Sequence, residues 1–326
     1  MKYLGVRLKP KSFLHLGDRE GWLEGSRVHI PSDTLFSALC HCHLLLYGEA
    51  DSFIDAFKGA EPPFIFSSAF PYWGSELYFP LPKNQLAKDK FLKKIKYVNA
   101  SLLIRLLNGE CLEDLKDEIE INQALDCLPR LNGSGKQAGG LVPWRVEDVP
   151  RVSLNRFNNH PGENFFYFGQ VSYVEDAGLF VLLKNIKKGW EDKINSLFRL
   201  LCDEGVGGDR SAGKGLFHQP EMFELEIPQI DKPGGLYALS AYFPRENELI
   251  DIESGFYELE ERKGYIFSPA NRSYRRRSIR LFSEGSVFAG LDKKGSLVDI
   301  TPAVFEVHRI YRYGLLFSFP CKLEET

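Results

Sequence analysis

The hydrophobic positions of this chain alternate with a period of two in some stretches and recur every three to four residues in others. Residues 2–8 alternate and predict a first strand, which Pro10 ends. Residues 32–47 carry apolar side chains on nearly every side and predict a buried helix. Ser32 or Asp33 can cap the start of this helix, and Gly48 stands where a C-terminal glycine is expected.

The same patterns continue through the middle of the chain. Residues 64–70 and 76–80 predict short strands, whereas residues 86–128 predict irregular helix. Residues 165–174 and 178–183 predict the two strands of a hairpin, because Glu-Asp-Ala-Gly joins them.

Two further elements complete an order of strand, helix, two strands, helix and strand. They are a helix over residues 190–202 and a strand over residues 217–227. This order is the β-α-β-β-α-β pattern of ferredoxin-like (RRM-like) domains. A large insertion, at about residues 80–160, interrupts it after the first helix.

A linker signal divides the chain at Pro228 and Lys232-Pro-Gly-Gly235, and the residues after it alternate mostly as strands. The length of 326 residues suggests roughly two domains. We therefore expect an α+β protein of two ferredoxin-like domains. Residues 1–228 would form the first, with the insertion, and residues 229–326 a degenerate, β-rich second.

Composition narrows the compartment and the kind of ligand. The chain is 44% hydrophobic and 26% charged, which is ordinary for a folded protein, and its formal net charge is −3. A polyanion site must therefore be a local patch. Six scattered cysteines, no apolar run long enough to span a membrane and no secretory signal favour a reducing cytoplasm.

The stretch Gly205-Val-Gly-Gly-Asp-Arg-Ser-Ala-Gly-Lys-Gly215 contains five glycines, and we call it the glycine loop. Glycine lets the backbone approach a ligand, and successive N–H groups in turns bind anions. Arg210 and Lys214 add positive charge. The loop resembles a P-loop, but Gly215 replaces the hydroxyl residue, and the loop joins a helix to a strand instead of a strand to a helix. A bound phosphate is thus favoured over an ATP or dinucleotide site.

Metal and catalytic sites have weaker support. Cys40-His-Cys-His43 lies on the predicted helix, where residues two apart do not share a face, and no second Cys or His pair completes a zinc site. The sequence contains no strong catalytic signature. His15 and His29 remain open as the acid or base of an RNA-cleaving site. We expect no metal and no cofactor.

Residues 271–280 read Asn-Arg-Ser-Tyr-Arg-Arg-Arg-Ser-Ile-Arg, with five arginines, one tyrosine and no acid. Arginine binds phosphate oxygens in a bidentate manner, and aromatic side chains stack on bases. Because the glycine loop is a second phosphate-binding candidate, the pair favours an extended polyanion over a single nucleotide.

These segments together resemble one family. The glycine loop is similar to that of the CRISPR RAMP superfamily, whose members bind CRISPR RNA through ferredoxin-like domains. Pro31-Ser-Asp-Thr-Leu-Phe-Ser-Ala-Leu39, Pro150-Arg-Val-Ser-Leu-Asn-Arg156 and Arg277-Ser-Ile-Arg-Leu-Phe-Ser-Glu-Gly-Ser-Val287 resemble segments of the fourth subunit of type III-A Csm effector complexes. The matches run from about residue 26 to the C-terminus.

The resemblance implies a non-catalytic subunit that binds the repeat-derived 5′ tag of CRISPR RNA. It would contact the large signalling and nuclease subunit and a backbone RAMP subunit, and residues 131–157 would press on the RNA as a thumb. The resemblance implies these RNA-binding residues: Ser32, Asp33, Thr34, Lys136, Arg151, Arg156, Gly207, Gly208, Arg210, Ser211, Lys214, Arg275, Arg276, Arg277 and Arg280. A RAMP-type RNA-processing endonuclease and the equivalent type III-B subunit remain alternatives.

Overall fold

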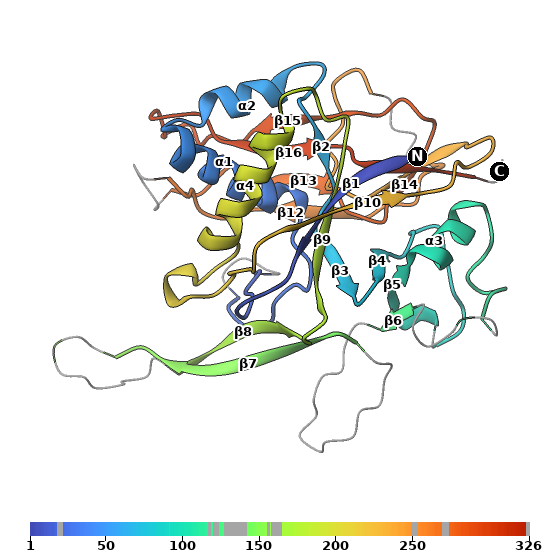
Figure 1. The fold of residues 1–326 in the computed structure, drawn as a ribbon, viewed down its shortest axis with the longest axis horizontal. Helices are drawn as coiled ribbons and strands as arrows, with labels where there is room; N and C mark the ends of the chain where they lie inside the picture. Colours follow the sequence, from blue (N-terminus) through green and yellow to red (C-terminus); the bar gives the residue numbers. More distant parts are fainter. Residues whose placement is uncertain are drawn as a thin grey trace.

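The computed structural model of the protein describes residues 1–17, 22–90, 92–116, 119, 124–126, 142–154, 157, 165–248, 253–268 and 274–323. Few helices and mostly antiparallel sheets make up this part of the chain (Figure 1). Lys136 and Arg156, two of the predicted RNA-binding residues, lie outside the described residues.

The N-terminal part holds the α-helices and the largest sheet. Its elements are β1 (Lys2–Leu8), α1 (Ser32–Tyr47), α2 (Asp51–Lys58), β2 (Ile65–Phe66), β3 (Phe70–Trp73), β4 (Glu76–Pro80), β5 (Ile95–Asn99), α3 (Ala100–Leu107), β6 (Ala124–Asp126), β7 (Trp144–Val152), β8 (Phe165–Tyr173), β9 (Ala177–Lys184), α4 (Glu191–Glu204) and β10 (Glu221–Glu226). Short 3-10 turns lie at Leu92–Lys94 and Arg210–Ala212.

The largest sheet runs in the order β10-β1-β9-β3-β4-β5-β6, and β2 also pairs with β9. Its strands pair antiparallel; Val6 of β1, for example, lies opposite Met222 of β10 and Val181 of β9. The apolar run of β9 explains its central place, because its side chains from Ala177 to Leu183 are all buried.

The predicted hairpin between residues 165–174 and 178–183 is wrong. β8 pairs instead with β7, from Trp144↔Tyr173 to Val152↔Phe165, while β9 pairs with β1 and β3. The side chains explain the difference, because β9 is apolar from Ala177 to Leu183 and belongs in the sheet, whereas β8 begins with an exposed residue. The β7–β8 hairpin therefore projects from the body of the protein (Figure 1).

The helical prediction for residues 86–128 is also largely wrong. Among the described residues of this stretch, the α-helix is confined to α3, and β5 and β6 flank it. Asn99 determines where α3 begins, because its side chain accepts a hydrogen bond from the Leu102 N–H at 3.0 Å.

The C-terminal part is rich in strands, as the sequence indicates. Its elements are β11 (Gly235–Ala238), β12 (Leu259–Arg262), β13 (Ile279–Phe282), β14 (Val287–Ala289), β15 (Gly295–Asp299), β16 (Tyr311–Leu315) and β17 (Ser318–Cys321). They form a three-stranded sheet β14-β11-β17 and the pairs β12–β13 and β15–β16. No helix occurs among the described residues beyond 228.

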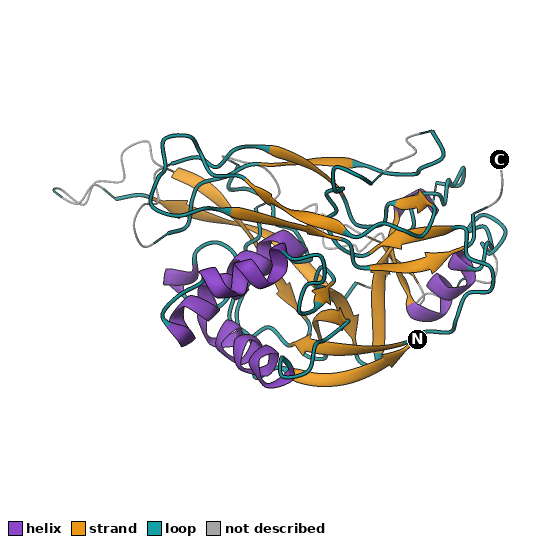
Figure 2. Cartoon of the chain, turned by 90° about the horizontal axis from the view of Figure 1, so that it is seen from above, coloured by secondary structure: helices purple, strands orange, loops and turns teal. Residues whose placement is uncertain are grey.

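One hydrophobic core joins the two parts. Phe36 and Phe66 belong to the same buried cluster as Tyr313 and Phe317, and the rings of Phe66 and Tyr313 stack with centroids 4.3 Å apart. Helix α1 packs on α4 and on β16. Figure 2 shows the helices in two places, with α3 apart from the larger group that contains α1 (Figure 1). Helix α1 thus lies between the two parts.

Candidate nucleic-acid interface

The glycine loop begins where α4 ends and depends on glycine at several positions. Gly207 has a φ of 99° and Gly215 a φ of 79°, values that residues with a side chain rarely adopt. A Cβ at Gly207 would lie 2.3 Å from the carbonyl oxygen of His15, and one at Gly215 would lie 2.2 Å from that of Val206. Only glycine fits these two positions without displacement of the backbone.

Backbone hydrogen bonds fasten the loop to the segment after β1. Gly208 donates to the His15 carbonyl at 2.8 Å, and Gly215 donates to the Phe13 carbonyl at 2.8 Å. Between these anchors, the backbone N–H groups of residues 209–211 have no acceptor among the described residues. Successive free N–H groups in a turn form an anion-binding concavity. These three consecutive donors are the feature of the loop that would suit an anion, and phosphate binding here stays a prediction.

Lys214 points inward. Its side chain is 7% exposed, and its Nζ donates to Gln170 Oε1 at 2.9 Å and lies 4.3 Å from the ring centre of Phe168. Burial, with a contribution from Arg151, lowers the pKa of Lys214. Because Lys214 is buried and bonded to Gln170, its side chain connects the loop to β8 within the protein.

Asp209 ties the loop to the β7–β8 hairpin. Its Oδ2 lies 2.8 Å from Nη2 of Arg151 and 3.9 Å from Nζ of Lys214, so one carboxylate lies between two cations. Arg151 also lies over the ring of Phe168, with 4.4 Å between its Cζ and the ring centre. The site gains a net positive charge, and Asp209, Gln170 and Phe168 are residues that the sequence analysis did not identify.

Arg210 joins the glycine loop to the C-terminal part. Its Cζ lies 4.8 Å from the ring centre of Phe267, which in turn contacts the His41 ring of α1 at 5.2 Å. Phe267 belongs to the same extended segment as Tyr265, which bridges to Arg275. We call Arg210, Tyr265, Phe267 and Arg275 the loop–hairpin surface, after the glycine loop and the β12–β13 hairpin, whose connecting segment carries the last three residues. It unites two sequence motifs that are far apart along the chain.

The arginines of the basic run divide into two kinds. Arg275, Arg277 and Arg280 are exposed. Arg276 turns inward, and burial, followed by the charge of Arg312, lowers its pKa to about 10. Three of the four predicted contacts thus have side chains that face solvent.

The start of α1 faces the C-terminal part. Ser32 is fully buried, and its Oγ accepts a hydrogen bond from the Ala241 N–H at 3.0 Å. Asp33 is 1% exposed and pairs with Arg312, while Nη2 of Arg262 lies 3.5 Å from its Oδ1. These two side chains are bonded within the protein, whereas Thr34 is half-buried.

The electrostatics at Asp33 are dominated by arginines. Burial alone would raise the pKa of this carboxyl group, but Arg262 and Arg312 outweigh burial and lower the pKa to about 2. Asp33 is therefore ionised at neutral pH, and its first contribution is to hold α1 against the C-terminal strands.

His15 and His29 lie apart, in different surroundings. His15 packs on Phe168 at a centroid distance of 4.1 Å, and its Nδ1 lies 2.7 Å from the Gly169 carbonyl oxygen. Burial lowers the pKa of both histidines, that of His29 to about 4. His29 contacts the Tyr97 hydroxyl at 3.0 Å. Each ring is engaged within the protein through its Nδ1.

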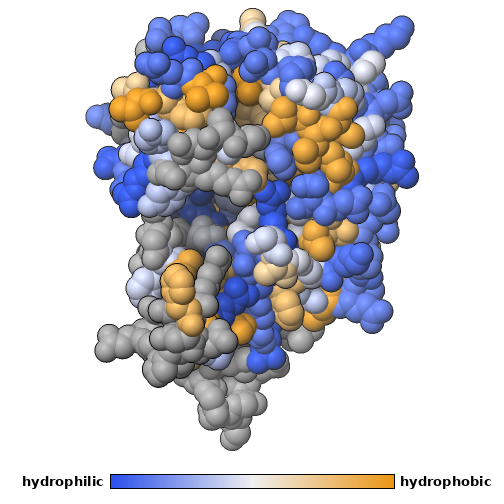
Figure 3. All heavy atoms as spheres, turned by 90° about the vertical axis from the view of Figure 1, so that its left-hand side faces the viewer, coloured by the Kyte–Doolittle hydropathy of each residue, from blue (hydrophilic) through white to orange (hydrophobic). Residues whose placement is uncertain are grey.

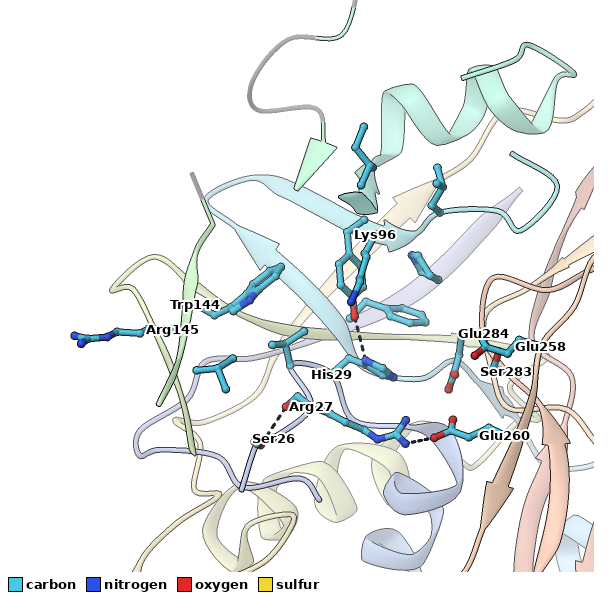
Figure 4. Close-up of a pocket in the computed structure, with 18 of the residues that line it drawn as sticks. Ser26, Arg27, His29, Lys96, Trp144, Arg145, Glu258, Glu260, Ser283 and Glu284 are labelled. Carbon is cyan, nitrogen blue, oxygen red and sulfur yellow. Dashed lines mark hydrogen bonds and ion pairs between the residues drawn. The ribbon is translucent and has the colours of Figure 1, made fainter. Parts of the chain in front are cut away.

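A broad groove of about 1770 Å³ lies beneath the β7–β8 hairpin (Figure 4). The labelled Trp144 and His29 point into it, and Arg27 pairs with Glu260 across it. Its lining has six acidic residues against four arginines and lysines: Glu24, Glu147, Asp148, Glu258, Glu260 and Glu284, and Arg27, Lys83, Lys96 and Arg145. This balance favours RNA less than the loop–hairpin surface does.

Among the described residues, no cluster of three or more histidine, cysteine or acidic side chains is placed to hold a metal ion. No helix in the described part of the chain is long and apolar enough to cross a membrane. Figure 3 looks onto the side that carries α1 and shows separate hydrophobic patches divided by hydrophilic surface.

Both parts of the chain are similar to known protein families. The family model of the RAMP superfamily matches residues 7–218, and that of the CRISPR Csm4 C-terminal domain matches residues 233–321. CRISPR system Cms protein Csm4 of Thermococcus onnurineus is 25% identical over 99% of this chain and 98% of its own length. That of Mycobacterium tuberculosis is 28% identical over 92% of both chains.

Solved structures share the fold. A Csm3–Csm4 subcomplex of the type III-A CRISPR-Cas interference complex matches with a TM-score of 0.68 at 20% identity, covering 99% of this chain and 100% of that chain. A Csm1–Csm4 cassette in complex with cA4 matches with a TM-score of 0.63 at 20% identity, over 100% of both chains. The chain therefore belongs to the RAMP superfamily and, within it, to the Csm4 CRISPR subunits.

Proposed function

We propose that this chain is a non-catalytic subunit of a type III-A CRISPR RNA-guided effector complex and binds the repeat-derived 5′ tag of CRISPR RNA. The observation that carries the proposal is the contact of Arg210 with Phe267, because it joins the glycine loop to residues 265–267, which pair with Tyr274 and Arg275 of the arginine run. A single nucleotide needs one phosphate-binding site, whereas two adjacent phosphate-binding sites suit a single-stranded nucleic acid.

Charge and backbone donors support a polyanionic ligand on this surface. The N–H groups of residues 209–211, which have no acceptor in the described part of the chain, suit one phosphate, and the exposed Arg275, Arg277 and Arg280 suit others. Arg151 and Lys214 position the loop through Asp209. The chain as a whole carries a charge of −3, so this cluster is a local departure from an acidic surface.

The partners follow from the relatives. Solved Csm4 chains of the same fold occur with Csm1 in one assembly and with Csm3 in another. We propose that this chain likewise links the large signalling and nuclease subunit to a backbone RAMP subunit, in the cytoplasm. The match to the Thermococcus onnurineus Csm4 relative covers 98% of that protein's length, which supports this proposal.

We also propose a ferredoxin-like arrangement for the first part. The succession β1, α1, β3, β9, α4 and β10 follows the β-α-β-β-α-β order, with β3 in place of the strand predicted at 165–174. The ferredoxin-like character of residues 229–326, and the boundary at residue 228, stay predictions.

The absence of catalysis is open to direct test. His15 and His29 lie apart, and both are bonded within the protein. Incubation with labelled repeat RNA should leave the RNA intact. Specific cleavage that His15→Ala or His29→Ala abolishes would instead support the RNA-processing endonuclease.

Crosslinking tests the RNA-binding proposal. The chain is assembled with a large subunit, a backbone subunit and CRISPR RNA that carries 4-thiouridine within the 5′ tag. Peptides from residues 205–215 and 274–280 should crosslink to the tag. Crosslinks confined to the spacer, or to other subunits, would contradict the proposal. Co-purification with type III-B rather than Csm subunits would favour the type III-B alternative.

A further inference from the structure

Two aromatic rings of the loop–hairpin surface stand out toward solvent. Tyr265 and Phe267 are each 51% exposed, whereas Ile266 and Ser268 are 3% and 2% exposed. Exposure therefore alternates over residues 265–268, and the two rings share the outward side of this segment.

Each ring has its own arginine. Arg275 Cζ lies 5.4 Å from the ring centre of Tyr265, and its Nε and Nη2 are each 3.4 Å from the tyrosine hydroxyl. Arg210 Cζ lies 4.8 Å from the ring centre of Phe267. These cations come from two distant parts of the sequence, and each lies over one of the two rings.

Contacts hold one of the rings in place before any ligand arrives. The His41 ring of α1 meets Phe267 edge-on, at a centroid distance of 5.2 Å and an angle of 82°. The Ile266 N–H donates to the Tyr274 carbonyl at 2.9 Å. This hydrogen bond holds residues 265–267, which carry the rings, against Tyr274 in the arginine run. A ring that is already ordered loses little conformational entropy on binding.

We propose that Tyr265 and Phe267 form a stacking platform for two neighbouring bases of single-stranded RNA, with Arg275 and Arg210 beside the flanking phosphates. The inference rests on the proposed function and adds how bases, not only phosphates, are held. Aromatic rings stack on any base, and stacking contributes without sequence readout. Two exposed rings flanked by cations suit a nucleic acid, because a base and its phosphate need both.

The direct test uses the full chain and a 12-nucleotide oligoadenylate that carries one 2-aminopurine. Binding should quench the 2-aminopurine fluorescence. Phe267→Leu and Tyr265→Leu should each weaken binding about 5- to 100-fold and relieve the quenching, while the dependence of affinity on salt stays that of the unmodified protein. Phe267→Trp should retain both affinity and quenching.

Phe256→Leu is the matched control, because Phe256 is an exposed phenylalanine of the same part of the chain, with 36% exposure, outside the loop–hairpin surface. It should change neither readout. Unchanged affinity and quenching in both leucine variants would overturn the platform. The proposed function would then still stand if Arg210→Ala with Arg275→Ala lowers the salt dependence.

Two other results have separate meanings. If the unmodified protein shows no salt-dependent RNA binding, the proposed function fails together with the platform. If the leucine variants bind RNA normally but no longer co-purify with the large subunit, the rings belong to a protein interface and the platform is wrong.

Discussion

Arginines serve two different ends in neighbouring parts of this molecule. Arg262 and Arg312 are buried around Asp33, where α1 meets the C-terminal strands. Arg275 and Arg277, by contrast, are exposed on the outside of the C-terminal part. The residue type is the same, so burial decides whether an arginine fastens the fold or presents its charge at the surface, where a phosphate can reach it.

The largest effect on stability is expected from the arginines that surround Asp33. Arg312→Ala leaves Asp33 as a buried charge with a weaker partner, and we expect a loss of about 3–5 kcal/mol in the free energy of unfolding. Urea unfolding measures it. Arg309→Ala is the matched control, because that side chain is 71% exposed, and its effect should stay within about 0.5 kcal/mol. Equal effects of the two changes would remove the distinction.

The pH dependence of stability sharpens the same contrast. The pKa of Asp33 is lowered from 3.8 to about 2 in the folded protein. Its stabilisation is therefore complete above about pH 4 and is lost as the pH falls toward 2, at a cost of roughly 2 kcal/mol. Urea unfolding between pH 5 and pH 2 should show a smaller acid loss in Asp33→Asn than in the unmodified protein.

Asp55→Asn serves as the control for that experiment, because Asp55 pairs with Lys58 on the exposed side of α2. Its acid loss should match that of the unmodified protein. If Asp33→Asn shows the same acid loss as well, the arginines do not hold Asp33 ionised.

Gly207 holds the glycine loop in its conformation, and its substitution should have a smaller effect on stability than the loss of Arg312. Gly207→Ala places a Cβ 2.3 Å from the His15 carbonyl oxygen at a φ of 99°, so the loop must shift. We expect about 1–2 kcal/mol of destabilisation by thermal or urea unfolding. Gly17→Ala, where the added Cβ meets nothing within 4 Å, should cost less. A Gly207→Ala protein as stable as Gly17→Ala would mean that the loop is not held as described.

Local sequence predicted some of these elements and missed others for identifiable reasons. The glycine loop and the buried α1 were predictable, because glycine spacing and all-round hydrophobicity are local signals. The pairing of β8 with β7 was not, because strand pairing depends on long-range burial. The inward turn of Asp33 and Lys214 was missed as well, since a polar side chain at a motif position does not reveal its partner.

The contact between Arg210 and Phe267 could not be predicted either. The two residues lie 57 positions apart, and the aromatic segment at 265–267 does not differ locally from an ordinary strand. The packing of α1 against both parts of the chain accompanies the meeting of the glycine loop with Phe267, in the segment that pairs with the arginine run. The candidate site is thus a tertiary feature assembled from two recognisable local motifs.

The dependence of RNA affinity on salt tests the central claim most directly. The logarithm of the association constant is plotted against the logarithm of salt concentration for the unmodified protein, for Arg210→Ala with Arg275→Ala, and for Arg105→Ala on α3. We expect the double variant to lose up to about one unit of slope per lost phosphate contact, with unfolding free energy unchanged. Arg105→Ala should keep the original slope. An unchanged slope in the double variant would contradict a phosphate-binding loop–hairpin surface.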